Sequence, residues 1–114
     1  MSKAKYALGL DFGTNSVRAL VVDTADGSEV GTAVHNYASG ENGIILDRHD
    51  PDLARQHPLD YLRGIDQSVK AALRQARKTQ DFKPEAVIGI GVDTTGSTPL
   101  PLDRAGQPLA ANKR

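Results

Sequence analysis

The stretch that decides the fold is LGLDFGTNSVRALVVD, residues 8–23. A short apolar run ends at Asp11, and after four residues centred on a glycine turn a second run, rich in Val and Leu, continues to residue 23. So few residues separate the two runs that only a hairpin can join them. The sequence therefore predicts two antiparallel strands over residues 5–11 and 16–23, with Gly13 in the turn.

Outward from this hairpin, the pair Asp26-Gly27 is typical of a second tight turn. Residues 29–37 then alternate apolar and polar side chains, which predicts a third antiparallel strand. Residues 38–57 are mostly polar and contain several Gly and Asp residues, so we expect a long loop with one short strand or one turn of helix.

The clearest periodic signal begins at Pro58, a residue favoured in the first turn of a helix. Apolar residues recur every three or four positions, at Leu59, Leu62, Ile65, Val69, Leu73 and Ala76. This spacing predicts an amphipathic helix whose apolar side faces the sheet. The continuous apolar run over residues 86–93 then predicts a strand buried on both faces.

Three antiparallel strands, a crossover helix and a fourth strand parallel to the first form an α/β pattern. It is the pattern of the ribonuclease H-like N-terminal subdomain of actin-like ATPases. Both inner strands end in a carboxylate, Asp11 and Asp93. Because the carboxyl ends of parallel strands meet at one edge, we expect both carboxylates, and the segments that follow them, to lie at a common edge where ligands bind.

Composition narrows the function classes. The 114 residues allow one domain at most, and 14 basic residues balance 14 acidic ones, whereas a nucleic-acid binder is normally basic. The absence of cysteine excludes disulfides and thiolate sites. The apolar stretch before Asp11 is too short for a signal peptide or a membrane span. We therefore expect a soluble cytoplasmic protein with neither nucleic acid nor membrane as a partner.

The first hairpin carries residue types suited to a nucleotide and its metal. Backbone N–H groups of a glycine turn, hydroxyls, an amide and a guanidinium can follow phosphate oxygens, and a carboxylate can hold Mg²⁺ through water. The candidates are Gly13, Thr14, Asn15, Ser16 and Arg18 for phosphate and Asp11 for the metal. The alternative is an ordinary polar hairpin turn with a solvated arginine.

A second polar cluster, DTTGST at residues 93–98, directly follows the fourth strand. Hydroxyl groups both donate and accept hydrogen bonds, so such a cluster suits a polyhydroxy ligand. The carboxylate, the four hydroxyls and the glycine of this cluster are all candidates for ligand contact. The alternative is a turn in which Ser and Thr bond to their own backbone.

Other phosphate motifs do not fit. The Asp-Phe-Gly at residues 11–13 comes too early for a protein kinase, because ten residues cannot hold the loop, lysine and catalytic segment that precede it there. A Walker A motif is absent, and residues 89–96 lack the spacing of a dinucleotide fold.

Taken together, LGLDFGTNSVRALVVD (residues 8–23) and GIGVDTTGSTPLPLDRAGQPLA (residues 89–110) resemble the N-terminus of the FGGY carbohydrate kinases. The resemblance implies an enzyme that uses ATP and Mg²⁺ to phosphorylate a sugar. The second motif is similar to that of members acting on the terminal hydroxyl of L-ribulose, in the bacterial use of L-arabinose.

The resemblance also implies roles for individual residues. Residues 13–16 and Arg18 would meet the nucleotide phosphates, Asp11 the magnesium, and residues 95–97 the sugar. Family members are several times longer, and their catalytic aspartate, adenine pocket and second lobe come later in the chain. We therefore expect residues 1–114 to be the N-terminal part of the first kinase domain, without a catalytic residue and inactive alone.

With a single long helix, one sheet face should remain apolar and exposed, where it would meet further chain or a second copy in a homo-oligomer. Two other hypotheses stay open. The first is a small ribonuclease H-like nuclease or Holliday-junction-resolvase-like protein that uses Asp11 and Asp93. The second is a non-catalytic nucleotide-binding module of the actin-like class.

Overall fold

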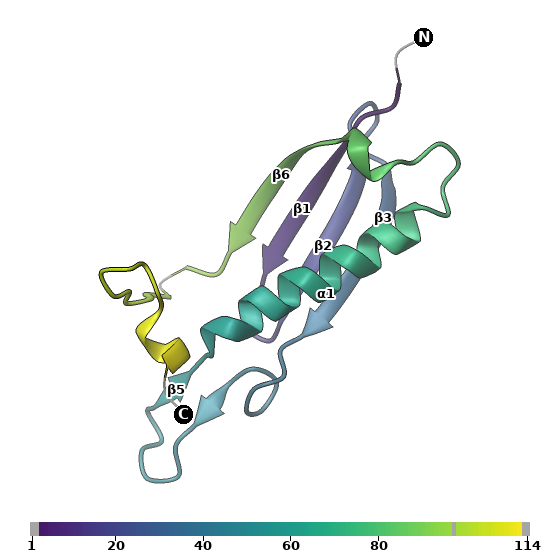
Figure 1. The fold of residues 1–114 in the computed structure, drawn as a ribbon. Coiled ribbons are helices and arrows are strands. Elements are labelled where there is room, and N and C mark those ends of the chain that lie inside the picture. The colour runs from purple at the N-terminus through teal and green to yellow at the C-terminus, as the bar shows by residue number, and fades with distance from the viewer. Residues whose placement is uncertain (1–2, 97, 113–114) are drawn as a thin grey trace.

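The computed structural model describes residues 3–96 and 98–112. Its centre is a four-stranded sheet in the order β3-β2-β1-β6, with the long helix α1 along one face (Figure 1). These main elements are β1 (Tyr6–Phe12), β2 (Ser16–Asp23), β3 (Glu29–Asn36), α1 (Pro58–Ala76) and β6 (Val87–Thr94). The smaller elements are β4 (Ile45–Leu46), β5 (Ala54–Arg55) and the 3-10 helices η1 (Pro84–Ala86) and η2 (Leu109–Asn112).

The topology confirms the predicted fold class. β1 runs antiparallel to β2 and β2 antiparallel to β3, while β6 lies beside β1 and runs parallel to it. Strand bounds agree with the sequence prediction to within a residue, since β1 begins at Tyr6 instead of Lys5. The loop at residues 38–57 differs slightly, because it contains two short strands, β4 and β5, that pair with each other.

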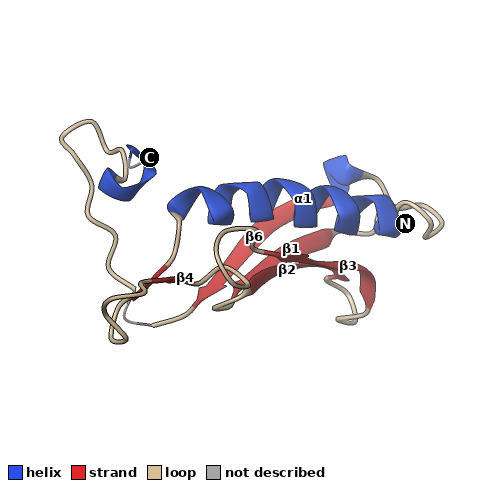
Figure 2. Cartoon of the chain, turned by 90° about the horizontal axis from the view of Figure 1, so that it is seen from below, coloured by secondary structure: helices blue, strands red, loops and turns tan. Residues whose placement is uncertain are grey.

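The core lies between the sheet and α1, as the view along the sheet in Figure 2 shows. Alternate residues of β1 and β2 point into it, in keeping with the two-residue period of a strand. The buried members from these strands are Tyr6, Leu8, Leu10, Val17, Ala19 and Val21. Phe82, after the helix, closes one end of the core with its ring edge-to-face against Tyr6 at a centroid distance of 4.8 Å.

The face of α1 that contacts the sheet differs from the predicted apolar stripe. Leu62 is 63% exposed, whereas the row Gly64, Ser68, Ala72 and Ala76 is buried. These small residues, four apart, let the helix approach closely: a Cβ on Gly64 would lie 2.6 Å from Val17 Cγ1. The larger residues Ile65, Val69 and Leu73 each follow one of these small residues and pack beside the row. The centre of the helix–sheet contact is therefore shifted by one residue from the predicted apolar stripe.

The prediction that the fourth strand is buried on both faces is wrong for this chain. β6 forms one edge of the sheet, and Ile88, Ile90 and Val92 are 63%, 64% and 63% exposed. The physical reason is the position of α1, which packs over β2 and β3. A continuous apolar run shows that a strand is suited to burial, but not which part of a protein covers it.

Exposed apolar residues lie on both sides of the sheet, and not only on the predicted side without α1. Leu8 pairs with Ile90 and Leu10 with Val92, so the apolar side chains of β6 share the side of the sheet that α1 partly covers. The opposite face carries glycines on β1 and on the edge strand β6, with Gly9 in register with Gly91. It also carries Val34 of β3, the register partner of Arg18, which is 51% exposed.

Candidate functional site

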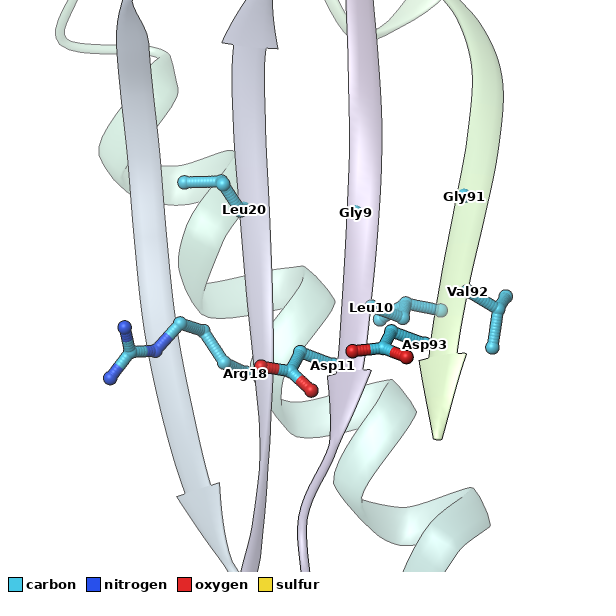
Figure 3. Close-up of a pocket in the computed structure, with 8 residues that line it drawn as sticks. All are labelled: Gly9, Leu10, Asp11, Arg18, Leu20, Gly91, Val92 and Asp93. Carbon is cyan, nitrogen blue, oxygen red and sulfur yellow. The ribbon is translucent and has the colours of Figure 1, made fainter. Parts of the chain in front are cut away.

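Two carboxylates lie side by side at the carboxyl ends of β1 and β6. Asp11 and Asp93 are partners in the parallel register, and both are exposed. Figure 3 shows their side chains on the same face of the sheet, the face turned away from α1. The sequence prediction of a common edge is therefore confirmed, since the hairpin after β1 and the segment after β6 leave the sheet together.

An open cavity of about 440 Å³ lies on this face beside the carboxylates. It is lined by Gly9, Leu10, Asp11, Arg18, Leu20, Gly91, Val92 and Asp93 (Figure 3). A Cβ built on Gly91 would meet no atom within 4 Å, so the backbone itself forms the floor. A ligand or another chain segment can therefore approach the main chain closely here.

Arg18 reaches the same face from β2, where it is the register partner of Asp11. Its guanidinium extends across β3, away from both carboxylates (Figure 3). Within the described residues, an ion pair forms between Lys70 and Asp66 on α1, and none joins Arg18 to Asp11. Arg18 is exposed and, among the described residues, forms no ion pair with either carboxylate, so its guanidinium is available to an anion.

The hairpin between β1 and β2 corrects one sequence expectation. The Gly13 N–H donates to the Ser16 carbonyl at 2.8 Å, so it is not a free donor for a ligand. Gly13 also lacks a left-handed backbone. A Cβ at position 13 would lie 3.3 Å from the Ser16 carbonyl oxygen. Glycine therefore suits this position because the backbone of Ser16 comes close to it. The exposed residues Thr14 and Asn15 at the tip retain other donors, namely the N–H and hydroxyl of Thr14 and the N–H of Asn15.

The loop at residues 38–57 holds this tip in place, which the sequence did not reveal. Asn15 Nδ2 donates to the Asn42 carbonyl and Gln56 Nε2 donates to the Thr14 carbonyl, both at 2.7 Å. The Tyr37 N–H donates to the Asn15 carbonyl at 2.9 Å. In the sequence, the length of this loop is the only signal, and it points to none of these residues.

Aromatic rings pack beneath the tip. Tyr61 of α1 lies edge-to-face against both Phe12 and Tyr37, at centroid distances of 5.9 and 5.4 Å. Burial raises the pKa of Tyr37 to about 12, with smaller contributions from the charges of Tyr61, Asp60 and Asp11. Burial, and then the charge of Asp60, also raises the pKa of Tyr61. Tyr61 therefore keeps its proton at neutral pH and donates it to Gln56 Oε1.

The segment after β6 is arranged more simply. Thr95 and Gly96 are exposed, and Ser97 lies outside the described residues. The Thr95 and Thr98 hydroxyls are 3.2 Å apart, and the Thr98 hydroxyl donates to the Gly96 carbonyl at 3.4 Å. These hydroxyls bond to one another and to their own backbone, while remaining accessible at the common edge.

Comparison with known families agrees with this fold and site. The family described as the FGGY family of carbohydrate kinases, N-terminal domain, matches residues 6–113. The chain belongs to the FGGY family of carbohydrate kinases. Family membership confirms the resemblance seen in the two motifs, and it does not favour the nuclease hypothesis.

This FGGY chain is similar to curated proteins named ribulokinase. It is 40% identical over 106 residues to that of Vibrio parahaemolyticus, covering 93% of this chain and 18% of the relative. It is 39% identical over 113 residues to that of Halalkalibacterium halodurans, covering 92% and 19%. The chain thus spans about a fifth of the length of these relatives.

A solved structure shares the fold of this FGGY chain. The crystal structure of a xyloylose kinase from Brucella ovis superposes with a TM-score of 0.71 at 29% sequence identity. The match covers 91% of this chain and 19% of that one. Within the described residues of the FGGY chain, no helix is both long and apolar enough to cross a membrane.

The two carboxylates of the FGGY chain fit a magnesium ion, which keeps several waters, better than a metal ion bound entirely by protein side chains. Asp11 and Asp93 place two exposed carboxylates together, and Mg²⁺ is typically held by one or two carboxylates while it keeps several waters. In residues 3–96 and 98–112 no group of three or more His, Cys, Asp or Glu side chains could hold an ion. The further carboxylates that two-metal nucleases use are therefore not supplied by these residues.

Proposed function

We propose that this chain supplies the phosphate-binding hairpin and part of the sugar site of an ATP-dependent pentulose kinase. The reaction is transfer of the ATP γ-phosphate to the terminal hydroxyl of L-ribulose, in the cytoplasmic catabolism of L-arabinose. The observation that supports the proposal is the register of Asp11 with Asp93, which brings the two candidate motifs to one edge. The ribulokinase relatives support the choice of L-ribulose.

At the hairpin, the phosphates of ATP would meet Gly13, Thr14, Asn15 and Ser16, with Arg18 as the neutralising charge. Gly13 would contribute a close approach of the backbone, because its N–H is already bonded to the Ser16 carbonyl. The N–H and hydroxyl of Thr14 and the N–H of Asn15 would be the donors. Phosphoryl transfer depends mainly on such positioning and charge neutralisation, because the protein does little covalent chemistry.

Asp11 would hold Mg²⁺ through water, and Asp93 lies next to it in register. A bound magnesium ion neutralises charge on the transferring phosphate. Exposure of both carboxylates leaves room for the metal's remaining waters.

At the end of β6, Thr95, Gly96 and Ser97 would contact the sugar. Hydroxyls can both donate to and accept from the hydroxyls of a pentulose. No residue of this chain is assigned as the base that takes the substrate proton. The 114-residue chain by itself is therefore expected to be inactive.

The test uses the full-length protein with Mg·ATP and L-ribulose, following ADP release. We expect turnover that requires L-ribulose and stops when EDTA removes the metal. Arg18→Gln should raise the KM for ATP by about tenfold or more, because a charge-assisted hydrogen bond is lost. Lys70→Gln, on the far side of the sheet on α1, is the matched control and should leave that KM unchanged. ATP turnover that ignores the pentulose would refute the proposal.

A further inference from the structure

Gln56 links the long loop, the helix and the hairpin tip through its two amide atoms. Its Nε2 donates to the Thr14 carbonyl at 2.7 Å, and its Oε1 accepts from the Tyr61 hydroxyl. A carbonyl can only accept, so the nitrogen must face Thr14 and the oxygen must face Tyr61. The amide therefore has one orientation, fixed at both ends.

The bond to Thr14 determines where the next N–H group points. The Thr14 carbonyl and the Asn15 N–H belong to one peptide unit, which is planar and trans. In such a unit the C=O and N–H bonds point in opposite directions. Because Gln56 holds the carbonyl, the Asn15 N–H points away from Gln56, and among the described residues it has no backbone or side-chain acceptor.

Two more bonds hold Asn15, one from Tyr37 directly before the long loop and one from Asn42 within it. Its carbonyl accepts from the Tyr37 N–H at 2.9 Å, and its side-chain Nδ2 donates to the Asn42 carbonyl at 2.7 Å. Within the described part of the chain, Asn15 thus has its Nδ2 and its carbonyl bonded and its own N–H without an acceptor. This is the arrangement of a backbone donor prepared for an external acceptor.

We propose that Gln56 is a positioning residue that orients the Asn15 N–H as a hydrogen-bond donor to a phosphate oxygen of the nucleotide. The proposal rests on the proposed kinase function. Gln56 does not touch the nucleotide, and it acts through the Thr14–Asn15 peptide. Tyr61 in turn fixes Gln56, and its ring is held by Phe12 and Tyr37.

The first test compares Gln56→Glu with wild type in the full-length protein. A carboxylate has no N–H to donate and repels the Thr14 carbonyl, so the peptide loses its orientation. We expect the KM for Mg·ATP to rise about tenfold to a hundredfold, as misplaced binding groups do, while the KM for the sugar stays unchanged. Tyr61→Phe keeps the ring and removes one of the two anchors of the amide, so it should give a smaller rise in the same constant.

Gln67→Glu is the matched control, since Gln67 is an exposed residue of α1 and makes no bond to the hairpin. It introduces the same charge and should leave both KM values at the wild-type level. Melting temperatures of all three variants separate a loss of folding from a loss of positioning. An equal rise in the KM for ATP and for sugar in Gln56→Glu would indicate a structural role and overturn the proposal.

The second test observes the donor directly, using full-length protein labelled with ¹⁵N-asparagine. In wild type, Mg·ATP should shift the Asn15 amide proton resonance downfield, and Gln56→Glu should reduce that shift. If wild type uses ATP and Gln56→Glu retains both its KM and the Asn15 shift, the inference about Gln56 is wrong while the kinase function stands. If wild type neither binds nor turns over Mg·ATP, both proposals fail.

Discussion

The two segments at the common edge that we propose to bind ligands are held in very different ways. The hairpin tip at residues 13–16 receives hydrogen bonds from Tyr37 and Gln56 and gives one to Asn42, all from outside the hairpin. The segment after β6 has hydrogen bonds within itself, between Thr95, Gly96 and Thr98. The comparison teaches that, among the described residues, the proposed phosphate-binding segment is held rigidly from outside, whereas the proposed sugar-binding segment is left adaptable.

The largest expected effect contrasts one residue from each segment. Asp11→Asn removes a charge proposed to hold magnesium at the rigid side, and it should lower kcat/KM about a hundredfold or more. Thr95→Val keeps the shape of the side chain and removes one hydroxyl at the adaptable side, so it should lower kcat/KM about tenfold. Steady-state kinetics of the full-length protein measure both. Equal losses would show that the two sides contribute alike and would remove the contrast.

The next prediction breaks the packing under the hairpin. Val17 lies directly after the hairpin turn, and a Cβ on Gly64 would lie 2.6 Å from its Cγ1. Gly64→Val must therefore push α1 away from β2. We expect about 2–3 kcal/mol less free energy of unfolding, as for other overpacked cores, measured by urea unfolding. Arg63→Val, at the neighbouring exposed position, is the control and should cost much less. A neutral Gly64→Val would show that the close approach is not needed.

A smaller effect is expected where the loop is attached to the helix. Asp60 is buried, and its carboxylate accepts from the Ser39 hydroxyl at 3.0 Å and from the Ser39 N–H at 3.3 Å. Ser39→Ala removes one donor from a buried charge, so the free energy of unfolding should fall by about 1–2 kcal/mol. Ser39→Thr retains the hydroxyl and should keep most of this free energy of unfolding. Thermal unfolding measures both, and equal behaviour of the two variants would exclude a role for the hydroxyl.

The smallest effect at neutral pH concerns Tyr37. Burial raises its pKa from the ordinary value of 10.0 to about 12, so the folded state keeps a proton that the unfolded state loses first. Stability from this group is therefore complete below pH 10 and is lost as the pH rises through about 12. Tyr37→Phe should flatten this alkaline loss without destabilising the protein at pH 7, because the buried hydroxyl has no partner among the described residues. Unfolding measured across this alkaline range tests the expectation, and an unchanged slope would contradict it.

The sequence predicts the central sheet well because its signals are local. Strand alternation in β2 and β3, the Asp26-Gly27 turn and the three- and four-residue spacing after Pro58 each act within a few residues. The common edge of Asp11 and Asp93 then follows from topology alone, because a helical crossover makes β6 parallel to β1.

The rest depends on contacts between distant residues, which periodicity does not encode. Gln56 and Thr14 are 42 positions apart, so nothing in the composition of either segment points to their hydrogen bond. The exposure of Leu62 and of Ile90 depends on which side of α1 faces the sheet and on how far α1 extends across it. The roles of the candidate ligand-binding residues stay predictions that the experiments above test.

The position of β6 has a practical consequence for anyone who handles the 114-residue chain by itself. Its outer edge pairs with no other strand of the described residues, and Ile88, Ile90 and Val92 extend along it more than half exposed. An apolar edge of this kind is a template on which further strands assemble, and such edges promote aggregation. The isolated chain should therefore be most tractable at low concentration, where intermolecular β-pairing is slow.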